Sequence, residues 1–334
     1  MIRTLGRSGI TASAIGMGCW AIGGPVYSGE TPVGWGEVDD KESERAIRTA
    51  LELGITLFDT ADVYGAGHSE RVLGRVLPGH RDTVVLATKF ANVFDEKTKQ
   101  ITGSDASPQY IQAACEASLS RLYTDYIDLY QFHDNGYPPD RIDDVLEALE
   151  LLVEAGKIRC YGWSTDDPER ARAFARGPHC AAVQFQMNVF SDAPLMVDLC
   201  AELNLAGLNR GPLAMGLLSG KYNADSVLPE NDVRGPNAPE WMSFFRDGKP
   251  SPEFLAMLAA VREILTSGGR TLVQGALAWL LARSPASFPI PGFKSAAQVA
   301  ENAGTPGPLS PDEMRQIEEL IRPGPAAQGG ATSL

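Results

Sequence analysis

The stretch LFDTADVYGAGHSERVLG, from Leu57 to Gly74, joins a short apolar run to a polar loop and then to a helical pattern. The apolar run ends on Asp59, Tyr64 follows five residues later, and the helical pattern restarts at Ser69. In a sheet whose strands lie parallel, the carboxyl ends of the strands share one face. The stretch therefore places a carboxylate and a phenol at one mouth of a sheet or barrel.

Three other apolar runs also end on a side chain that can take part in chemistry. VVLATK ends on Lys89, IDLYQFH ends on His133 and CYGWS ends on Ser164. Each residue alone could have a plain structural role, as a cap, a solvated lysine or a packed histidine. Together with Asp59 and Tyr64, the amine and the imidazole form a set of groups that can transfer a proton.

The alternation of apolar runs and helical patterns predicts an α/β fold, a (β/α)8 TIM barrel. Strands are predicted at 14–18, 55–59, 83–88, 126–133, 158–164, 181–186, 205–209 and 287–290. Helices are predicted at 40–53, 69–77, 108–122, 140–155, 168–176, 193–203, 252–265 and 271–283. A short N-terminal hairpin is expected around the turn at 6–9. A doubly wound sheet is the competing architecture, but no GxGxxG motif follows the first strand.

The chain of 334 residues shows no composition shift that marks a domain boundary. We expect one barrel domain over 1–322 and a flexible tail, rich in glycine and alanine, over 323–334. The longest irregular segment, 211–251, is rich in proline, glycine and asparagine. Loops of that length usually have a function, so we interpret it as an active-site flap.

The net charge of -13 argues against nucleic acid or an anionic membrane as a partner, because both would repel this protein. The five cysteines are scattered, with no CxxC pair, and no metal site is expected. The chain lacks a secretory signal and any run of ~18 consecutive apolar residues. These features favour a cytoplasmic protein with a small-molecule substrate.

The longer motifs resemble those of the aldo-keto reductase family. They are FDTADVYGAGHSERVLG, VVLATK, DYIDLYQFH, GKIRCYGWS, AVQFQMN, GPLAMGLLSGKY and IPGFKSAAQVAEN, and they follow the family order over nearly the whole chain. The resemblance implies a (β/α)8 barrel, NADPH as a cofactor preferred over NADH, and reversible hydride transfer between the nicotinamide and an aldehyde or ketone. It assigns catalysis to four residues, Asp59, Tyr64, Lys89 and His133.

The chemistry of these four groups is consistent with that assignment. A tyrosine with an ordinary pKa near ~10 holds its proton at neutral pH and can donate it to an alkoxide. A nearby Lys89 ammonium would stabilise the phenolate and lower the pKa of Tyr64. Asp59 is expected to pair with Lys89, and His133 to hydrogen-bond the substrate oxygen or to help share the proton.

The resemblance also implies contacts with the cofactor. Ser164 and Gln184 match groups that hold the nicotinamide amide, Arg210 matches a stacking group, and Lys294 begins the adenosine phosphate site before a helix N-terminus. The full predicted set is Ser164, Thr165, Gln184, Arg210, Gly211, Pro212, Leu213, Gly292, Lys294, Gln298, Glu301 and Asn302. Thr165 and Gly211 stand where many members have asparagine and serine.

Aromatic residues are expected to form the wall of the substrate pocket. The predicted residues are Trp20, Tyr27, Trp35 and Phe90, with Trp241 and Phe244 as further candidates.

Two other functions stay open: a Schiff-base aldolase or lyase that uses Lys89, and a regulatory subunit that binds NADPH to sense redox state. Borohydride trapping of a substrate on Lys89 would favour the aldolase, and stoichiometric NADPH consumption would favour the reductase.

Overall fold

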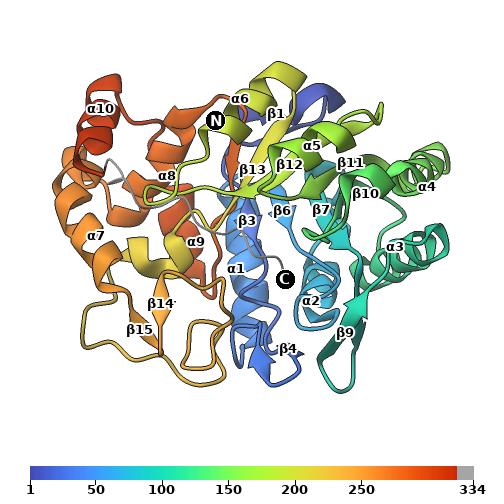
Figure 1. Cartoon of the computed structure of the whole chain (residues 1–334), viewed down its shortest axis with the longest axis horizontal. Helices are drawn as coiled ribbons and strands as arrows, with labels where there is room; N and C mark the ends of the chain where they lie inside the picture. Colours follow the sequence, from blue (N-terminus) through green and yellow to red (C-terminus); the bar gives the residue numbers. More distant parts are fainter. Residues whose placement is uncertain (322–334) are drawn as a thin grey trace.

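A computed structural model describes residues 1–321 of the chain, and its central feature is one sheet of eight parallel strands (Figure 1). The strand order is β16-β13-β12-β11-β10-β7-β6-β3. The strands are β3 (Met17–Gly18), β6 (Leu57–Asp59), β7 (Val85–Phe90), β10 (Ile127–Phe132), β11 (Ile158–Ser164), β12 (Cys180–Gln186), β13 (Ala206–Arg210) and β16 (Ser287–Pro289). Each of the eight lies within or close to a predicted strand.

Backbone contacts between the first and last strand regions close the sheet into a barrel. The Gly16 amide donates to Pro289 O at 3.0 Å, the Gly18 amide donates to Pro291 O at 2.9 Å, and Gly18 forms a parallel bridge with Gly292. A Cβ atom at Gly18 would lie 2.6 Å from Ile290 O, so only glycine permits this approach. The predicted (β/α)8 barrel is confirmed.

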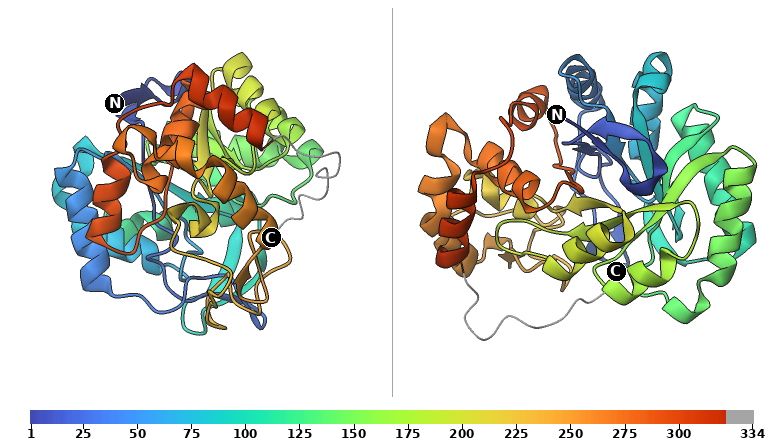
Figure 2. Two further views of the ribbon diagram at one scale, coloured as in Figure 1. Left: turned by 90° about the vertical axis from the view of Figure 1, so that its left-hand side faces the viewer. Right: turned by 90° about the horizontal axis from the view of Figure 1, so that it is seen from above.

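Helices surround the barrel, as two further views show (Figure 2). They are α1 (Asp40–Glu52), α2 (His68–Val76), α3 (Pro108–Leu122), α4 (Asp143–Glu154), α5 (Pro168–Phe174), α6 (Pro194–Leu203), α7 (Pro252–Leu265), α8 (Leu272–Arg283), α9 (Ala296–Ala303) and α10 (Pro311–Leu320). Local sequence sets their starts: the Ser107 hydroxyl accepts from the Tyr110 amide, and Ser310 with Glu313 forms a capping box. No helix within residues 1–321 is long and apolar enough to cross a membrane.

The N-terminal hairpin closes the floor of the barrel. Strands β1 (Ile2–Thr4) and β2 (Thr11–Ser13) pair antiparallel, as predicted. Three of the hairpin residues, Leu5, Ile10 and Ala12, join a buried cluster with strand residues such as Leu57 and Phe288. The lower part of the barrel is therefore filled with apolar side chains, which leaves the opposite end for polar groups.

Additional strands gather at the end of the barrel away from this hairpin (Figure 1). One small sheet has the order β5-β4-β9-β8, built from β4 (Tyr27–Ser28), β5 (Thr31–Pro32), β8 (Asn92–Asp95) and β9 (Gln100–Ser104). A second hairpin pairs β14 (Phe245–Arg246) with β15 (Lys249–Pro250) inside the 211–251 segment.

The 211–251 segment crosses to the loop that follows β3. Trp35 forms an antiparallel bridge with Asp232, and the Val233 amide donates to Gly34 O at 2.9 Å. The Arg234 guanidinium lies 4.5 Å from the centre of the Trp35 ring. These contacts support the interpretation of the segment as a flap, which stays a prediction, as does the single domain over 1–322. The predicted flexible tail, 323–334, lies outside the described residues.

Candidate active site

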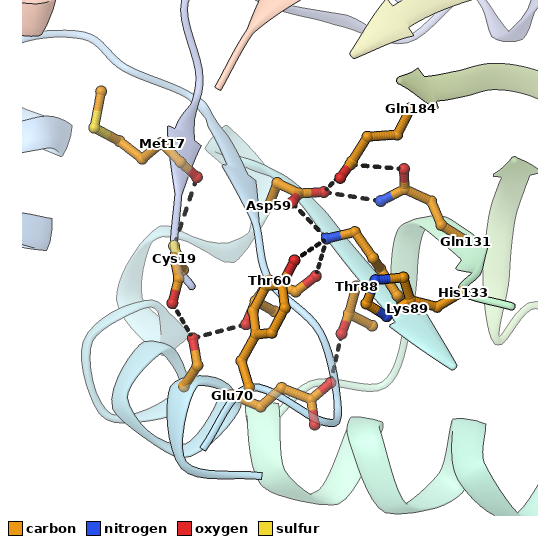
Figure 3. Close-up of polar contacts among 12 residues, drawn as sticks. Met17, Cys19, Asp59, Thr60, Glu70, Thr88, Lys89, Gln131, His133 and Gln184 are labelled. Atoms are coloured by element: carbon orange, nitrogen blue, oxygen red, sulfur yellow. Dashed lines mark hydrogen bonds and ion pairs between the residues drawn. The ribbon is translucent and has the colours of Figure 1, made fainter. Parts of the chain in front are cut away.

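Lys89 lies at the centre of a buried polar cluster at the carboxyl end of β7 (Figure 3). Its ammonium donates to Asp59 Oδ1 at 2.6 Å, to Thr60 O at 2.8 Å and to Tyr64 Oη at 3.1 Å. The Lys89 side chain is 0 % exposed and that of Asp59 is 2 % exposed. Three acceptors match the three ammonium hydrogens, which offsets the loss of water on burial.

The second oxygen of Asp59 is held by two glutamine amides. Gln131 and Gln184 each donate to Asp59 Oδ2 at 2.8 Å, and Gln184 also donates to Gln131 Oε1 at 3.0 Å. Asp59 therefore has defined partners on both oxygens and fixes the position of Lys89. Gln184 also lines the cavity, where a contact with a cofactor is expected. Its amide therefore holds Asp59 in place in addition to that expected contact.

Burial and charge have opposite effects on the pKa values of Tyr64 and Lys89, which share a hydrogen bond. Burial raises the pKa of the Tyr64 hydroxyl, and the positive charge of Lys89 offsets part of this shift. The prediction of a lowered tyrosine pKa is thus wrong for the net shift, although the effect of Lys89 has the expected sign. Burial acts to lower the pKa of Lys89, but the charge of Asp59 and the contact with Tyr64 overcome it and raise that pKa. The amine stays protonated at neutral pH.

His133 follows the end of β10 and faces the cavity beside Tyr64. The two ring centres lie 6.1 Å apart with the planes nearly perpendicular. Burial lowers the pKa of His133 well below its usual range, and the charges of Lys89 and Arg210 act in the same direction. His133 is therefore neutral at physiological pH, so it can exchange hydrogen bonds without carrying a charge.

A cavity of 1120 Å³ extends from these groups to the start of α9. Its wall includes most of the predicted cofactor residues: Ser164, Gln184, Arg210, Gly211, Pro212, Leu213, Gly292, Lys294, Gln298, Glu301 and Asn302. Thr165 is the exception, because it is fully buried behind the wall, where its hydroxyl accepts from the Asp167 amide at 3.2 Å. This part of the prediction is corrected. The cavity is large enough for a dinucleotide and a small second molecule.

The end of the cavity near α9 contains a cation and a helix N-terminus. Lys294 donates to Trp35 O at 2.7 Å, and Ser295 caps α9 by accepting from the Gln298 amide at 3.4 Å. Burial lowers the pKa of Lys294, a shift that a bound phosphate would oppose. Glu42 accepts from the Ala296 amide at 3.0 Å, so one carboxylate already lies at this N-terminus.

Tryptophans form the wall above the Tyr64 ring. Trp20 stacks on Tyr64 with ring centres 6.0 Å apart, contacts Trp35 edge-on at 5.3 Å and lies 6.3 Å from Trp241. All four residues line the cavity, together with Asn92 and Asn135. Three of the predicted residues, Trp20, Trp35 and Trp241, therefore form a continuous aromatic surface beside the polar cluster.

Comparison with known proteins identifies the family. The model of the Aldo/keto reductase family matches residues 14–322. The chain belongs to this family. It is 32% identical to aldo-keto reductase YhdN of Bacillus subtilis over 327 residues, which cover 95% of this chain and 92% of the relative. It is also 34% identical to the chloroplastic pyridoxal reductase of Arabidopsis thaliana, over 95% of this chain and 85% of the relative.

Solved structures give the same result for the fold. The glycerol dehydrogenase of Gluconobacter oxydans superposes with a TM-score of 0.79 at 30% identity, over 97% of this chain and 96% of that one. An aldo-keto reductase of Klebsiella pneumoniae in complex with NADPH gives a TM-score of 0.71 at 29% identity, over 97% of each chain. The chain is accordingly an oxidoreductase that acts on carbonyl or alcohol groups.

Three aromatic residues that were predicted to form the wall of the substrate pocket do not lie in it. Tyr27 does not line the cavity, although its neighbours Val26 and Ser28 do. Phe90 is 0 % exposed and stacks on Tyr130 at 4.5 Å, because successive strand residues point to opposite faces and Lys89 points into the barrel. Phe244 is also buried and packs on Phe254 at 4.8 Å.

Sequence reasoning missed three polar residues of the site. Gln131 donates to Asp59, the Asn92 amide lies against His133, and Asp166 forms an ion pair with Arg210. Gln131 carried a signal, because it is a polar residue inside the apolar run IDLYQFH. Asp166 lies in the loop after β11 and Asn92 begins the short strand β8 outside the barrel; polar residues are common in such segments, so the sequence did not distinguish them.

Proposed function

We propose that this aldo/keto reductase uses NADPH to transfer hydride reversibly between the nicotinamide and an aldehyde or ketone, with Tyr64 as the general acid and base. The observation that supports this best is the 3.1 Å contact between Lys89 Nζ and Tyr64 Oη at the wall of a dinucleotide-sized cavity. A phenol that faces a substrate and is backed by an ammonium is suited to give and take a proton.

Each residue of the site has a separate role in the reduction. Bound NADPH supplies the hydride to the carbonyl carbon. Tyr64 Oη gives its proton to the oxygen that gains negative charge, and the Lys89 ammonium stabilises the phenolate that remains. Asp59 holds Lys89 in position through their ion pair. Neutral His133 orients the substrate oxygen by a hydrogen bond, and the reverse steps oxidise an alcohol.

The chemistry of the cavity wall fits NADPH. Ser164 and Gln184 offer polar groups to the nicotinamide amide, and the Arg210 plane, fixed by Asp166, gives the ring a surface to stack on. Lys294 and the N-terminus of α9 offer positive charge to the adenosine phosphate. The neighbouring structure from Klebsiella pneumoniae in complex with NADPH supports this cofactor.

The two competing functions are less well supported. A Schiff-base enzyme needs a neutral lysine amine, whereas the pKa of Lys89 is raised and its three hydrogens are taken by hydrogen bonds. A purely regulatory NADPH-binding role leaves unexplained why four acid–base groups meet at the cavity. The small-molecule partner, the lack of nucleic-acid or membrane partners and the cytoplasmic location stay predictions.

The function is tested by following NADPH oxidation with a panel of aldehydes and ketones, and by borohydride treatment with the same compounds. We expect one NADPH consumed for each alcohol formed and no compound trapped on Lys89. Tight NADPH binding with no consumption across the panel would favour the regulatory role. Covalent trapping on Lys89 would favour the aldolase.

A further inference from the structure

Ala91 is a strained residue between Lys89 and Asn92, the residue that contacts His133. Ala91 has φ 110°, a conformation that residues with a Cβ atom rarely adopt. Such a residue costs about 1–3 kcal/mol and persists where the surrounding structure holds it. Here the Asp105 amide donates to Ala91 O at 2.8 Å, and the His133 amide donates to Phe90 O at 2.9 Å. The fold therefore maintains a sharp turn directly after β7.

The turn brings the side chain of Asn92 against His133. The Asn92 amide nitrogen lies 3.3 Å from His133 O and 3.4 Å from His133 Nδ1. Tyr110 Oη donates to Asn92 O at 2.6 Å, and the pairing of Asn92 with Ser104 anchors the start of β8. Asn92 and His133 both line the cavity.

The arrangement determines which nitrogen of His133 carries the proton. A backbone carbonyl oxygen only accepts hydrogen bonds, so the amide nitrogen of Asn92, and not its oxygen, must face His133 O. The same nitrogen also faces Nδ1, and its hydrogens can only donate. Nδ1 must therefore accept, and in a neutral imidazole the proton is then on Nε2.

We propose that Asn92 is a positioning residue that holds His133 in the tautomer with the proton on Nε2. The ring then offers a donor, and not a lone pair, to a substrate oxygen in the cavity. A donor stabilises the negative charge that develops on a carbonyl oxygen during reduction, whereas a lone pair would repel it. The benefit to catalysis rests on the proposed function, but the tautomer itself follows from the contacts of Asn92.

Nitrogen NMR of the full-length protein labelled with 15N-histidine tests the tautomer without any turnover. The chain has four histidines, and a His133→Asn variant assigns the His133 signals. We expect an unprotonated Nδ1 and a protonated Nε2 in the parent protein. In Asn92→Asp, the carboxylate accepts from Nδ1, so Nδ1 should gain a proton. Protonated Nδ1 in the parent, or signals unchanged in Asn92→Asp, would overturn the proposal.

Kinetic comparison with a matched control separates this role from simple support of the loop. Asn92→Leu should lower kcat about tenfold, the effect expected for one misplaced hydrogen bond, with NADPH affinity unchanged. Tyr110→Phe removes a contact to the Asn92 backbone but keeps the Asn92 amide. It should lower the Tm and leave the His133 NMR signals in place. The same change of His133 signals in Tyr110→Phe as in Asn92→Leu would contradict a role for the amide. Absence of turnover in all proteins, with the expected NMR result, would refute the proposed function and leave the tautomer assignment standing.

Discussion

Replacing Lys89 with methionine is expected to reduce stability and catalysis by separate routes. The change removes an ammonium that makes three hydrogen bonds and leaves the Asp59 carboxylate, 2 % exposed, without its ion-pair partner. Removal of one member of a buried ion pair costs about 3–5 kcal/mol. The amides of Gln131 and Gln184 still donate to Asp59, so we expect the lower end of that range.

The double variant Asp59→Asn with Lys89→Met provides the matched control. It removes both charges together, so no uncompensated carboxylate stays buried, and most of the lost stability should return. Catalysis should not return, because a neutral side chain at 89 cannot stabilise the Tyr64 phenolate. We expect kcat/KM to fall about 10²–10⁴-fold in both variants.

Urea unfolding followed by circular dichroism measures the stability difference, and NADPH consumption measures the activity of the same samples. A double variant as unstable as the single one would refute the argument that an unpaired Asp59 causes the loss. Recovery of activity along with stability would show that Lys89 acts through folding and not on Tyr64.

Three further predictions concern pH, cofactor preference and barrel closure. Burial raises the pKa of Tyr64 from its usual 10.0, so the rate of reduction should be independent of pH through the neutral range. The rate of oxidation, which needs the phenolate, should rise with pH. A rate of reduction that falls between neutral and mildly alkaline pH would contradict this. Lys294→Ala should weaken NADPH binding about tenfold and NADH binding much less, as judged by fluorescence titration, and equal losses would place the phosphate contact elsewhere. Gly18→Ala should destabilise the protein by about 1–3 kcal/mol because the new Cβ atom would lie 2.6 Å from Ile290 O. Gly79→Ala is the control and should not destabilise it, because a Cβ atom at Gly79 would have no neighbouring atom within 4 Å. Thermal unfolding of the two glycine variants checks this, and equal Tm values would argue against close packing at the barrel seam.

The sequence was most informative where one strand pattern repeated. Apolar runs that end on Asp59, Lys89 and His133 predicted both the barrel and the face on which these residues meet, because parallel strands share that face. The same strand geometry shows why Phe90 was misplaced. It follows Lys89 directly, so it points out of the barrel and into the apolar layer beneath the helices.

Loops were less predictable than strands. The length of the 211–251 segment indicated a function, but its bridge from Asp232 to Trp35 depends on contacts between distant parts of the chain. Asn92 likewise reaches His133 only because of the strained turn at Ala91, which composition does not reveal. The buried amide of Gln131 was within reach of sequence reasoning, since a polar residue in a buried strand needs a partner.

The central claim is that the Tyr64 hydroxyl supplies the proton for carbonyl reduction. Single-turnover reduction of a reactive aldehyde by the Tyr64→Phe variant with bound NADPH tests it most directly, with NADPH affinity measured on the same sample. The account predicts an NADPH affinity close to that of the parent protein and a rate of reduction at least about 10²-fold lower. A variant that binds NADPH and reduces the aldehyde at the rate of the parent protein would contradict it.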